Sequence, residues 1–259
     1  MFCKIIGYPL IKPRSVILWK KFFKKKKLKI NMQPFQIKPT HFNKEINQLF
    51  KNKKFLAAAV TMPYKKRIIS KIIVNDKVSN FAKAINFVIK KKNKVYGLNT
   101  DVYGALQTIK KFKKKNIIIY GFGGTGEAIT RVFLNVYKKT RLIVMSNKKK
   151  PKDLTSKNLK FIKRKDKIVL SNIDIFINCS PLGSNLKKEY LNKSPLTKYQ
   201  LSFANKNLLI FDIVYNPKKT LLSRYCKELK IKYVNGIGMN TVQAKLALRE
   251  IYRYCKEVC

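Results

Sequence analysis

Acidic residues and histidine are scarce in this sequence. Only 12 of its 259 residues are aspartate or glutamate, against 59 lysines and arginines, and His41 is the single histidine. The five cysteines have no zinc-ligand spacing. The sequence therefore predicts no metal site, and we expect reduced thiols in a cytoplasmic protein.

Long apolar runs are also missing. No stretch approaches the roughly 18 apolar residues of a membrane-spanning helix, and the first ten residues do not form a basic leader followed by an apolar segment. We therefore expect no membrane partner. The 46% of hydrophobic residues can still fill the cores of one large domain or two ordinary ones.

The basic residues are spread along the chain. A net charge of +47 would favour polyanions. However, only eight of the basic residues are arginine, the better reader of bases and phosphates, and the lysines occur in short runs throughout. We expect no specific nucleic-acid partner, and such a role stays open as an alternative.

Strand and helix patterns alternate over the first hundred residues. We predict strands at residues 5–7, 31–36 and 56–61, helices at 15–25, 42–51 and 65–77, and a hairpin over 87–98. This order predicts a small α/β unit.

A β-branched run, a glycine turn and an amphipathic stretch follow one another from residue 116 to residue 137. Further strands are predicted at residues 142–145, 167–170, 175–178 and 208–213, and a final helix at 240–254. The succession is typical of a parallel Rossmann-type sheet with right-handed crossovers.

Gly121, Gly123 and Gly126 have the G-x-G-x-x-G spacing of a dinucleotide-binding turn. Such glycines let a pyrophosphate approach the N–H groups at a helix N-terminus. An NAD site usually has an acidic residue after the second strand, but residues 146–152 read SNKKKPK, which would attract a 2′-phosphate. The sequence therefore favours NADP over NAD, and a tight turn without a ligand is the structural alternative.

Seven short motifs, in order and spread over nearly the whole chain, resemble those of the shikimate dehydrogenase family. They are Gly7-Tyr8-Pro9, Val60-Thr61-Met62-Pro63-Tyr64-Lys65, Ala84-Ile85-Asn86, Asn99-Thr100-Asp101, Asn178-Cys179-Ser180-Pro181-Leu182-Gly183, Asp212-Ile213-Val214-Tyr215-Asn216-Pro217, and Asn235-Gly236-Ile237-Gly238-Met239 leading to Gln243-Ala244. The resemblance implies a substrate-binding catalytic domain over residues 1–101, a Rossmann NADP-binding domain over 102–234, and a C-terminal helical segment over 235–259 that packs on the substrate domain. We expect a monomer or homodimer.

The resemblance implies the NADP-dependent, reversible reduction of 3-dehydroshikimate to shikimate in the chorismate pathway of aromatic amino acid biosynthesis. Reducing a ring ketone leaves an alkoxide that must take a proton, and with no histidine except His41 this is left to another side chain. The family uses a lysine and an aspartate, which its motifs place at Lys65 and Asp101. In the structural alternatives, Lys65 is one solvated lysine among many and Asp101 caps the following helix.

Hydroxyl and amide side chains suit a substrate that has a carboxylate and three hydroxyls. By the resemblance, Ser15 and Tyr215 hold the carboxylate, Asn86 and Gln243 hold ring hydroxyls, and Thr61 belongs to the same site. Asn86 in a turn and Tyr215 in a core are the structural alternatives. The expected cofactor contacts are Gly121, Gly123, Gly124, Gly126, Asn147, Lys148, Lys152, Gly236 and Met239.

Four positions depart from the family's pattern. Pro13 replaces a serine and removes one carboxylate contact, for which Arg14 or a neighbouring lysine is a hypothetical substitute. Phe87 and Val102 stand where the family usually has threonine and glycine. Glu127 stands where it often has a basic residue, which weakens the argument for a 2′-phosphate. We expect lower affinity rather than lost chemistry.

Two other functions are compatible with these residues. One is an NAD-using quinate/shikimate dehydrogenase, which shares the motifs. The other is a non-catalytic, basic dinucleotide- or nucleic-acid-binding descendant of the enzyme. The presence of both Lys65 and Asp101 favours the enzyme.

Overall fold

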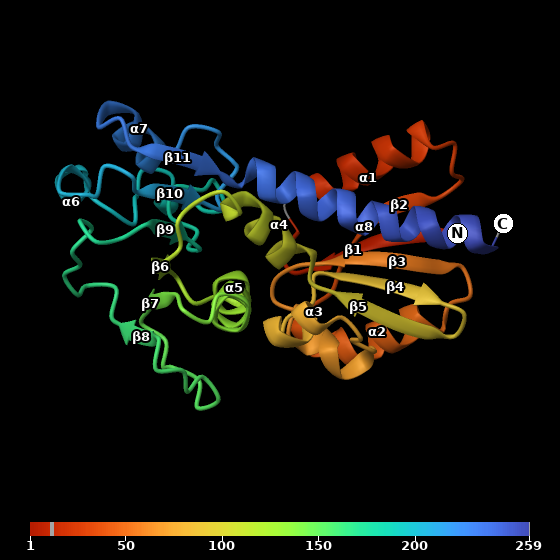
Figure 1. Cartoon of the computed structure of the whole chain (residues 1–259). Coiled ribbons are helices and arrows are strands. Elements are labelled where there is room, and N and C mark those ends of the chain that lie inside the picture. The colour runs from red at the N-terminus through yellow and green to blue at the C-terminus, as the bar shows by residue number, and fades with distance from the viewer. Residues whose placement is uncertain (11–12, 259) are drawn as a thin grey trace. The chain divides into compact units, whose positions relative to one another are not determined.

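The computed structural model describes residues 1–10 and 13–258, which form two compact units (Figure 1). One unit comprises Met1–Gly104 and Thr241–Cys259, and the other comprises Ala105–Asn240. Each unit is built around its own sheet. The predicted α/β class with a parallel Rossmann-type sheet is confirmed.

The first unit has a mixed five-stranded sheet in the order β2-β1-β3-β4-β5. The strands are β1 (Phe2–Gly7), β2 (Asn31–Gln36), β3 (Phe55–Val60), β4 (Phe87–Lys91) and β5 (Lys94–Leu98). Around it lie α1 (Arg14–Lys25), α2 (Phe42–Lys51) and α3 (Lys77–Ala82), with 3-10 turns at Pro39–His41 and Arg67–Lys71. β1 is parallel to β2 and β3, whereas β4 is antiparallel to β3 and β5.

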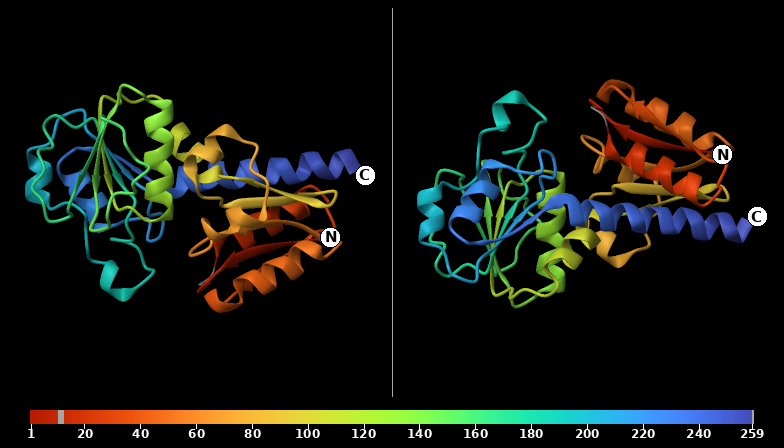
Figure 2. Two further views of the ribbon diagram at one scale, coloured as in Figure 1. Left: turned by 90° about the horizontal axis from the view of Figure 1, so that it is seen from below. Right: turned by 90° about the horizontal axis from the view of Figure 1, so that it is seen from above.

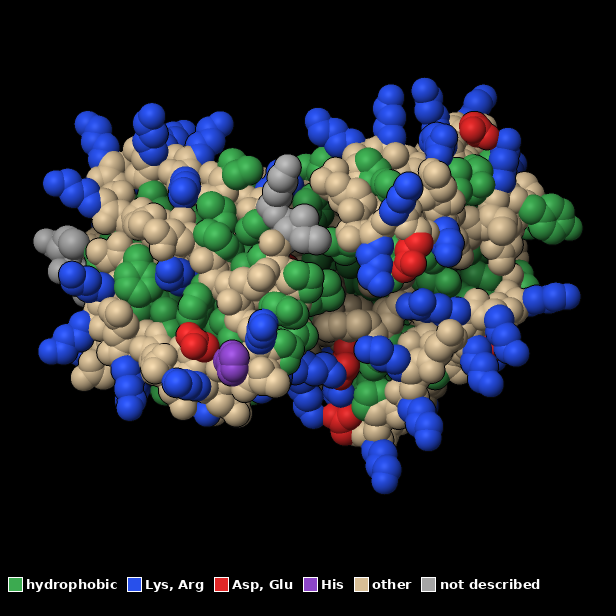
Figure 3. Space-filling view, turned by 180° about the vertical axis from the view of Figure 1, so that it is seen from behind, with side chains coloured by type: hydrophobic (Ala, Val, Ile, Leu, Met, Phe, Trp, Pro, Cys, Tyr) green, Lys and Arg blue, Asp and Glu red, His purple; other side chains and the backbone are tan. Residues whose placement is uncertain are grey.

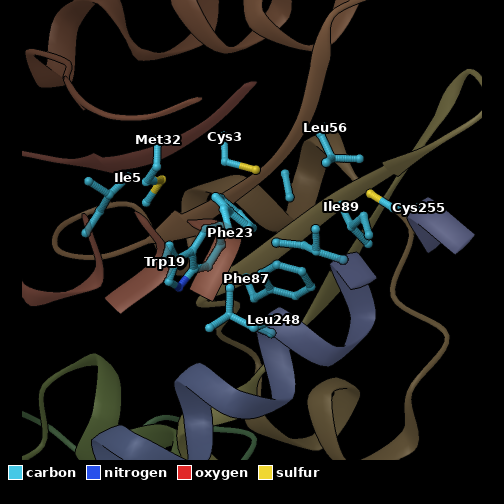
Figure 4. Packing of buried hydrophobic residues seen from close by; sticks show 13 residues of the cluster. Cys3, Ile5, Trp19, Phe23, Met32, Leu56, Phe87, Ile89, Leu248 and Cys255 are labelled. Carbon is cyan, nitrogen blue, oxygen red and sulfur yellow. The ribbon is translucent and has the colours of Figure 1, made fainter. Parts of the chain in front are cut away.

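Side chains of the first sheet alternate between two cores, as the period of a strand requires. Ile5 faces a cluster that contains Trp19 from α1 and Ile251 from the C-terminal helix (Figure 4). The next residue, Ile6, faces a separate cluster that contains Phe42 from α2. The sheet is therefore buried on both faces, and the C-terminal helix completes one of the two cores.

The second unit has a parallel six-stranded sheet in the order β11-β10-β9-β6-β7-β8. Its strands are β6 (Asn116–Tyr120), β7 (Arg141–Met145), β8 (Leu159–Ile162), β9 (Ile175–Asn178), β10 (Leu209–Asp212) and β11 (Lys232–Asn235). Its helices are α5 (Gly124–Val136), α6 (Lys198–Ser202) and α7 (Leu221–Glu228), with a 3-10 turn at Lys188–Tyr190. The chain passes between the units within α4 (Thr100–Ile109) and α8 (Gly236–Val258).

The second sheet is doubly wound, because the strand order reverses between β6 and β9. Helix α5 lies along β6 and β7 (Figure 2). Residues 146–158, which connect β7 to β8, are all described and none of them is helical. An extended, lysine-rich connection thus takes the place that a crossover helix has in a regular βαβ unit.

The strand predicted at residues 167–170 is wrong. The third strand in the chain order of this sheet is β8, which pairs with β7 at the edge. Leu170 is buried in the core below the sheet, whereas Val169 is 72% exposed. A loop that covers a core can thus be as apolar as a strand, and an edge strand such as LKFI can look like a loop.

The helix predicted at residues 65–77 is also wrong. Only the 3-10 turn Arg67–Lys71 forms there. Ile73 then makes an isolated parallel bridge to Tyr96. Isoleucine and valine are stiff at the first side-chain torsion and favour extended backbone, which explains why the helix does not continue.

The described residues contain neither a metal-ligand cluster nor a disulfide. Within them, no three histidine, cysteine, aspartate or glutamate side chains lie close enough to hold a metal ion. Cys3, Cys179, Cys226 and Cys255 take part in no disulfide, and Cys259 lies outside the described part of the chain. None of the described helices combines the length and apolar character needed to cross a membrane.

We predict that Ile251→Ala lowers the free energy of unfolding by about 3 kcal/mol, because it leaves a cavity in the core around Trp19. Urea denaturation followed by the fluorescence of Trp19, the single tryptophan, measures the change. The exposed neighbour Arg253→Ala is the control, with an expected change below about 0.5 kcal/mol. Equal effects of the two substitutions would contradict the packing of α8 on this core.

Candidate active site

The predicted substrate residues come from segments that meet at one edge of the first sheet. β1 and β3 are parallel, so their carboxyl ends lie at the same edge. β4 starts and β5 ends at this edge, because Phe87 pairs with both Ala59 and Leu98. The chain therefore brings residues 61–65, 84–86 and 99–101 together.

Lys65 and Asp101 form an ion pair at this edge. The Lys65 Nζ lies 2.6 Å from the Asp101 Oδ2, and each side chain is 16% exposed. At this distance the ammonium donates a charge-assisted hydrogen bond to the carboxylate. The pair is open enough for a ligand to reach and buried enough to have a fixed geometry.

The backbone around Lys65 is held by its neighbours. Tyr64 is fully buried, stacks on Phe42, and donates a hydrogen bond from its hydroxyl to the Ile37 carbonyl. The Lys65 carbonyl accepts a 2.7 Å hydrogen bond from the Ile85 N–H. The residue before the lysine thus acts as an anchor, which gives a physical reason for tyrosine in the Tyr64-Lys65 motif.

Asp101 lies in the first turn of α4 and is not its N-cap. The helix begins at Thr100, and the Asn99 Oδ1 accepts a 3.1 Å hydrogen bond from the Val102 N–H. Asn99 therefore caps the helix, and the alternative that gave this role to Asp101 is wrong. The Asp101 carboxylate is left to pair with Lys65, at a helix N-terminus that favours negative charge.

Thr100 links two of the predicted substrate residues. The Asn86 Nδ2 donates to the Thr100 Oγ1 at 3.0 Å, and the Thr100 N–H donates to the Asn86 Oδ1 at 2.7 Å. The Thr100 Oγ1 also donates to the Gln243 Oε1 at 3.2 Å. Asn86, Thr100 and Gln243 thus form one hydrogen-bonded group. Thr100 was not among the predicted site residues, although it stands between Asn99 and Asp101 in a motif.

Gly7 and Thr61 are packed against each other at the ends of β1 and β3. The Thr61 N–H donates to the Ile6 carbonyl at 2.9 Å, which continues the pairing of β1 with β3. A Cβ on Gly7 would lie 2.4 Å from the Thr61 Cγ2, so only glycine fits beside this threonine. Thr61 is therefore fixed at the same edge, where its hydroxyl can serve as a donor and acceptor.

Ser15 lies in the first turn of α1, next to Arg14, and is partly buried. Pro13 is the N-cap residue and provides no side-chain cap. The neighbouring Lys12, one of the possible substitutes for the missing serine contact, lies outside the described residues. A hydroxyl and a guanidinium at the N-terminus of a 12-residue helix suit a carboxylate.

Two of the departures from the family's pattern are core residues. Phe87 is 1% exposed and packs edge-on against Trp19, and Val102 is fully buried. Their side chains fill the interior behind the sheet edge. They therefore act on the site through packing rather than by contact with a ligand.

The glycine turn of the second unit fits a dinucleotide. Gly121 has a φ of +100°, and a Cβ on Gly126 would lie 2.0 Å from the Gly121 carbonyl oxygen. A Cβ on Gly123 would meet nothing within 4 Å. The first and last glycines thus permit the tight turn, while Gly123 leaves open backbone at the start of the 13-residue helix α5.

Glu127 is paired with an arginine inside the protein. It is 5% exposed, and its Oε1 accepts hydrogen bonds of 3.0 and 2.9 Å from Arg131. Arg131 also bonds both carboxylate oxygens of Asp153, at 2.8 and 3.1 Å. These bonds tie Asp153, in the middle of the lysine-rich connection, to α5. Glu127 is therefore paired within the unit, but Arg131 is shared with Asp153, so one positive charge faces two negative ones and the objection to a 2′-phosphate stands.

The remaining predicted cofactor residues lie after strands of the second sheet. Asn147, Lys148 and Lys152 are exposed in the connection that follows β7. Gly236 begins α8 after β11, where a Cβ would lie 2.1 Å from the Ile213 carbonyl oxygen, and Met239 is 6% exposed.

Tyr215 follows β10 and is 37% exposed, so the alternative of a core tyrosine is wrong. Its role toward a substrate stays a prediction.

We predict that Arg131→Met lowers the free energy of unfolding by about 3 kcal/mol, because the Glu127 carboxylate stays buried without its partner. Urea denaturation followed by far-ultraviolet circular dichroism measures this. Arg141→Met removes an exposed arginine of the same unit and is the control. Glu127→Gln added to Arg131→Met should restore part of the loss; equal losses in the single and double variants would contradict the assignment.

Asp212 is the centre of a buried polar network. It is fully buried at the end of β10 and accepts hydrogen bonds from Asn178, Val214, Thr220 and Tyr233. Burial raises its pKa to about 6, although these hydrogen bonds lower it in part. The network holds the loops that follow neighbouring strands, including the motif around Asn178.

The raised pKa of Asp212 predicts a pH-dependent stability. An aspartate with a pKa of about 6 in the folded state and about 4 unfolded stabilises the fold most below pH 4. This contribution falls by up to about 3 kcal/mol as the pH rises through 6. The difference in unfolding free energy between wild type and Asp212→Asn, measured by urea denaturation from pH 4 to 7, should fall accordingly. A constant difference would contradict the raised pKa.

The sheet order, the glycine turn and the edge site define a two-unit α/β protein of the dinucleotide-binding type. Residues 5–88 match the family described as the shikimate dehydrogenase substrate binding domain. The resemblance to shikimate dehydrogenases that the motifs predicted is confirmed by this match and by relatives that align over nearly the whole chain.

Known relatives match over almost the full chain. The shikimate dehydrogenase (NADP(+)) of Clostridium botulinum is 28% identical over 94% of this chain and 93% of its own. That of Methanocaldococcus jannaschii is 26% identical over 95% and 89%. A shikimate dehydrogenase solved in complex with NADP+ superposes with a TM-score of 0.83 at 25% identity, over 96% and 89% of the two chains. The Thermotoga maritima enzyme shares the fold, with a TM-score of 0.80 at 20% identity over the full length of both.

Proposed function

We propose that this chain catalyses the reversible, NADP-dependent reduction of 3-dehydroshikimate to shikimate, in the chorismate pathway of aromatic amino acid biosynthesis. The observation that carries the proposal is the ion pair of Lys65 and Asp101, 2.6 Å apart at the sheet edge. The curated relatives named for this activity support it. Their similarity covers both units of the chain.

Lys65 and Asp101 can carry out the proton transfer of the reaction. Bound NADPH supplies the hydride that converts the ketone carbon to a secondary alcohol. The Lys65 ammonium donates a hydrogen bond to the ketone oxygen, stabilises the negative charge that develops there, and delivers the proton. Asp101 holds the ammonium in position and accepts from a substrate hydroxyl. In the reverse direction, neutral Lys65 removes the hydroxyl proton.

The proposed substrate residues form two groups, one for the ring hydroxyls and one for the carboxylate. Asn86 and Gln243, joined through Thr100, offer amide groups to ring hydroxyls, and Thr61 lies at the same edge. Ser15 offers a hydroxyl to the carboxylate, with Arg14 beside it. Tyr215 supplies a further hydroxyl to this carboxylate in the proposal.

NADP is proposed over NAD on the basis of charge. Residues 146–152 contain four lysines and no acid, and the nearby Glu127 is paired with Arg131. The main alternative is an NAD-using quinate/shikimate dehydrogenase. A 2′-phosphate would gain from these lysines, whereas the ribose hydroxyls of NAD lack the acidic acceptor that they usually have.

Charge distribution supports the enzyme over a nucleic-acid-binding descendant. Basic side chains are scattered over the face in Figure 3 rather than gathered in one patch. Sequence-independent binding of polyanions works best with a continuous basic surface. We therefore propose a small-molecule substrate, no specific nucleic-acid partner, a monomer or homodimer, and a cytoplasmic location.

We predict that Lys65→Ala and Asp101→Ala each lower kcat at least about 100-fold, because each removes part of the proton-transfer pair. Shikimate-dependent reduction of NADP+ measures the rate, and circular dichroism checks the fold. Lys66→Ala, next in sequence and exposed, is the control and should keep wild-type activity.

Three results would contradict the proposal. Wild type that does not oxidise shikimate would refute the activity, and full activity of Lys65→Ala would refute the assigned chemistry. Faster turnover with NAD+ and quinate than with NADP+ and shikimate would favour the alternative dehydrogenase.

A further inference from the structure

The basic residues of the lysine-rich connection, residues 146–158, are all lysines, whereas the loop after the next strand contains an arginine. Arg164 lies just after β8, one strand beyond the connection that follows β7. It is one of only eight arginines in the chain. The 2′-phosphate of NADP is predicted to lie at the end of β7, so a residue from β8 can reach it only if its loop turns back toward β7.

The loop after β8 does turn back. The Lys163 N–H donates to the Asp166 Oδ2 at 2.8 Å, and the Asp166 N–H donates to the Lys163 carbonyl at 3.1 Å. These bonds close a tight turn with Arg164 inside it. The Arg164 N–H donates to the Asn147 Oδ1 at 3.3 Å, which joins this turn to the predicted cofactor residue after β7.

The side chain of Arg164 extends further, to the end of β6. Its guanidinium carbon lies 5.2 Å from the centroid of the Tyr120 ring. Tyr120 is the last residue of β6 and directly precedes Gly121 of the glycine turn. The arginine thus crosses the ends of three neighbouring strands, from β8 over β7 to β6, in the region where the adenosine end of a dinucleotide lies in this type of fold.

The charge around this position suits a phosphate. An open pocket of about 520 Å³ lies between the ends of β7 and β8; Lys163 and Lys165, on either side of Arg164 in sequence, line it, and Arg164 itself does not. Its charged lining residues are Lys148, Lys149, Lys150, Lys163, Lys165 and Asp166. The one acid among them accepts the hydrogen bond that closes the turn, and the five lysines leave a strong excess of positive charge.

We propose that Arg164 binds the 2′-phosphate of NADP and is a residue by which the chain selects NADP over NAD. The inference rests on the proposed function and adds a residue from a different loop than the one the family resemblance indicated. The guanidinium carbon lies 5.2 Å from the Tyr120 ring centroid, and the planar fork of a guanidinium can bond two phosphate oxygens. Lysine is a point charge and cannot reproduce this geometry.

The test compares ligand pairs that differ only in the 2′-phosphate. Dissociation constants are measured by calorimetry at fixed salt for NADP+ against NAD+, and for adenosine 2′,5′-bisphosphate against adenosine 5′-monophosphate. The variants are Arg164→Ala, Arg164→Lys and Lys167→Ala. The last removes one positive charge from the same segment between β8 and β9 and is the matched control. Thermal unfolding confirms that each variant is folded.

Arg164→Ala should weaken NADP+ and the bisphosphate at least about tenfold, the usual effect of a lost hydrogen bond to a charged group. NAD+ and the monophosphate should bind as to wild type. Arg164→Lys should recover only part of the loss, and Lys167→Ala should change NADP+ binding less than about twofold, as expected for a screened surface charge.

Three outcomes would overturn the inference. Unchanged NADP+ binding by Arg164→Ala would do so while leaving the proposed function intact. Equal weakening of NADP+ and NAD+ would assign Arg164 to the adenine instead of the phosphate. Wild type that binds neither dinucleotide would refute both this inference and the proposed cofactor.

Discussion

The ion pair of Lys65 and Asp101 is the interaction on which the proposed chemistry depends. Its partners are 36 residues apart in the sequence and 2.6 Å apart in space. An ammonium held against a carboxylate has a defined direction, which a solvated lysine lacks. The fold maintains this direction through buried neighbours: Tyr64 anchors the chain before Lys65, and Asn99 caps the helix that carries Asp101.

Scarce acidic residues hold defined structural positions in this basic chain. Asp101 pairs with Lys65, Glu127 pairs with Arg131, and Asp212 collects four hydrogen bonds in the core of the second unit. Asp76 caps α3 and accepts a hydrogen bond from the Tyr103 hydroxyl. Lysines and arginines, in contrast, are spread over the face shown in Figure 3. In such a composition an acidic residue is a stronger indicator of a specific role than a basic one.

The parts of the fold that could be predicted from sequence are those with strong local patterns. The strand Asn31–Gln36 and the helix Phe42–Lys51 have their predicted limits, and so do the strands Asn116–Tyr120 and Ile175–Asn178. β8 escaped prediction because an edge strand buries few side chains, and its apolar content does not exceed that of the loop that follows it.

The candidate site could be predicted in part, through motifs that name residue types at fixed spacing. Lys65, Asp101, Asn86 and Gln243 were all expected, whereas Thr100 was not. Thr100 matters because its N–H and its hydroxyl reach side chains 14 and 143 residues away, respectively. No spacing along the chain encodes such a contact.

The sequence by itself determined the α/β class, the glycine turn and the chemical types of the site residues, because these follow from local periodicity and short motifs. Only the tertiary structure decided that Asn99 rather than Asp101 caps α4, that Arg131 pairs with both Glu127 and Asp153, and that Arg164 reaches Tyr120. Each of these depends on a hydrogen bond or ring contact whose partners are brought together by packing. Distances between such groups follow from how strands pair and helices pack, and residue order alone does not specify them.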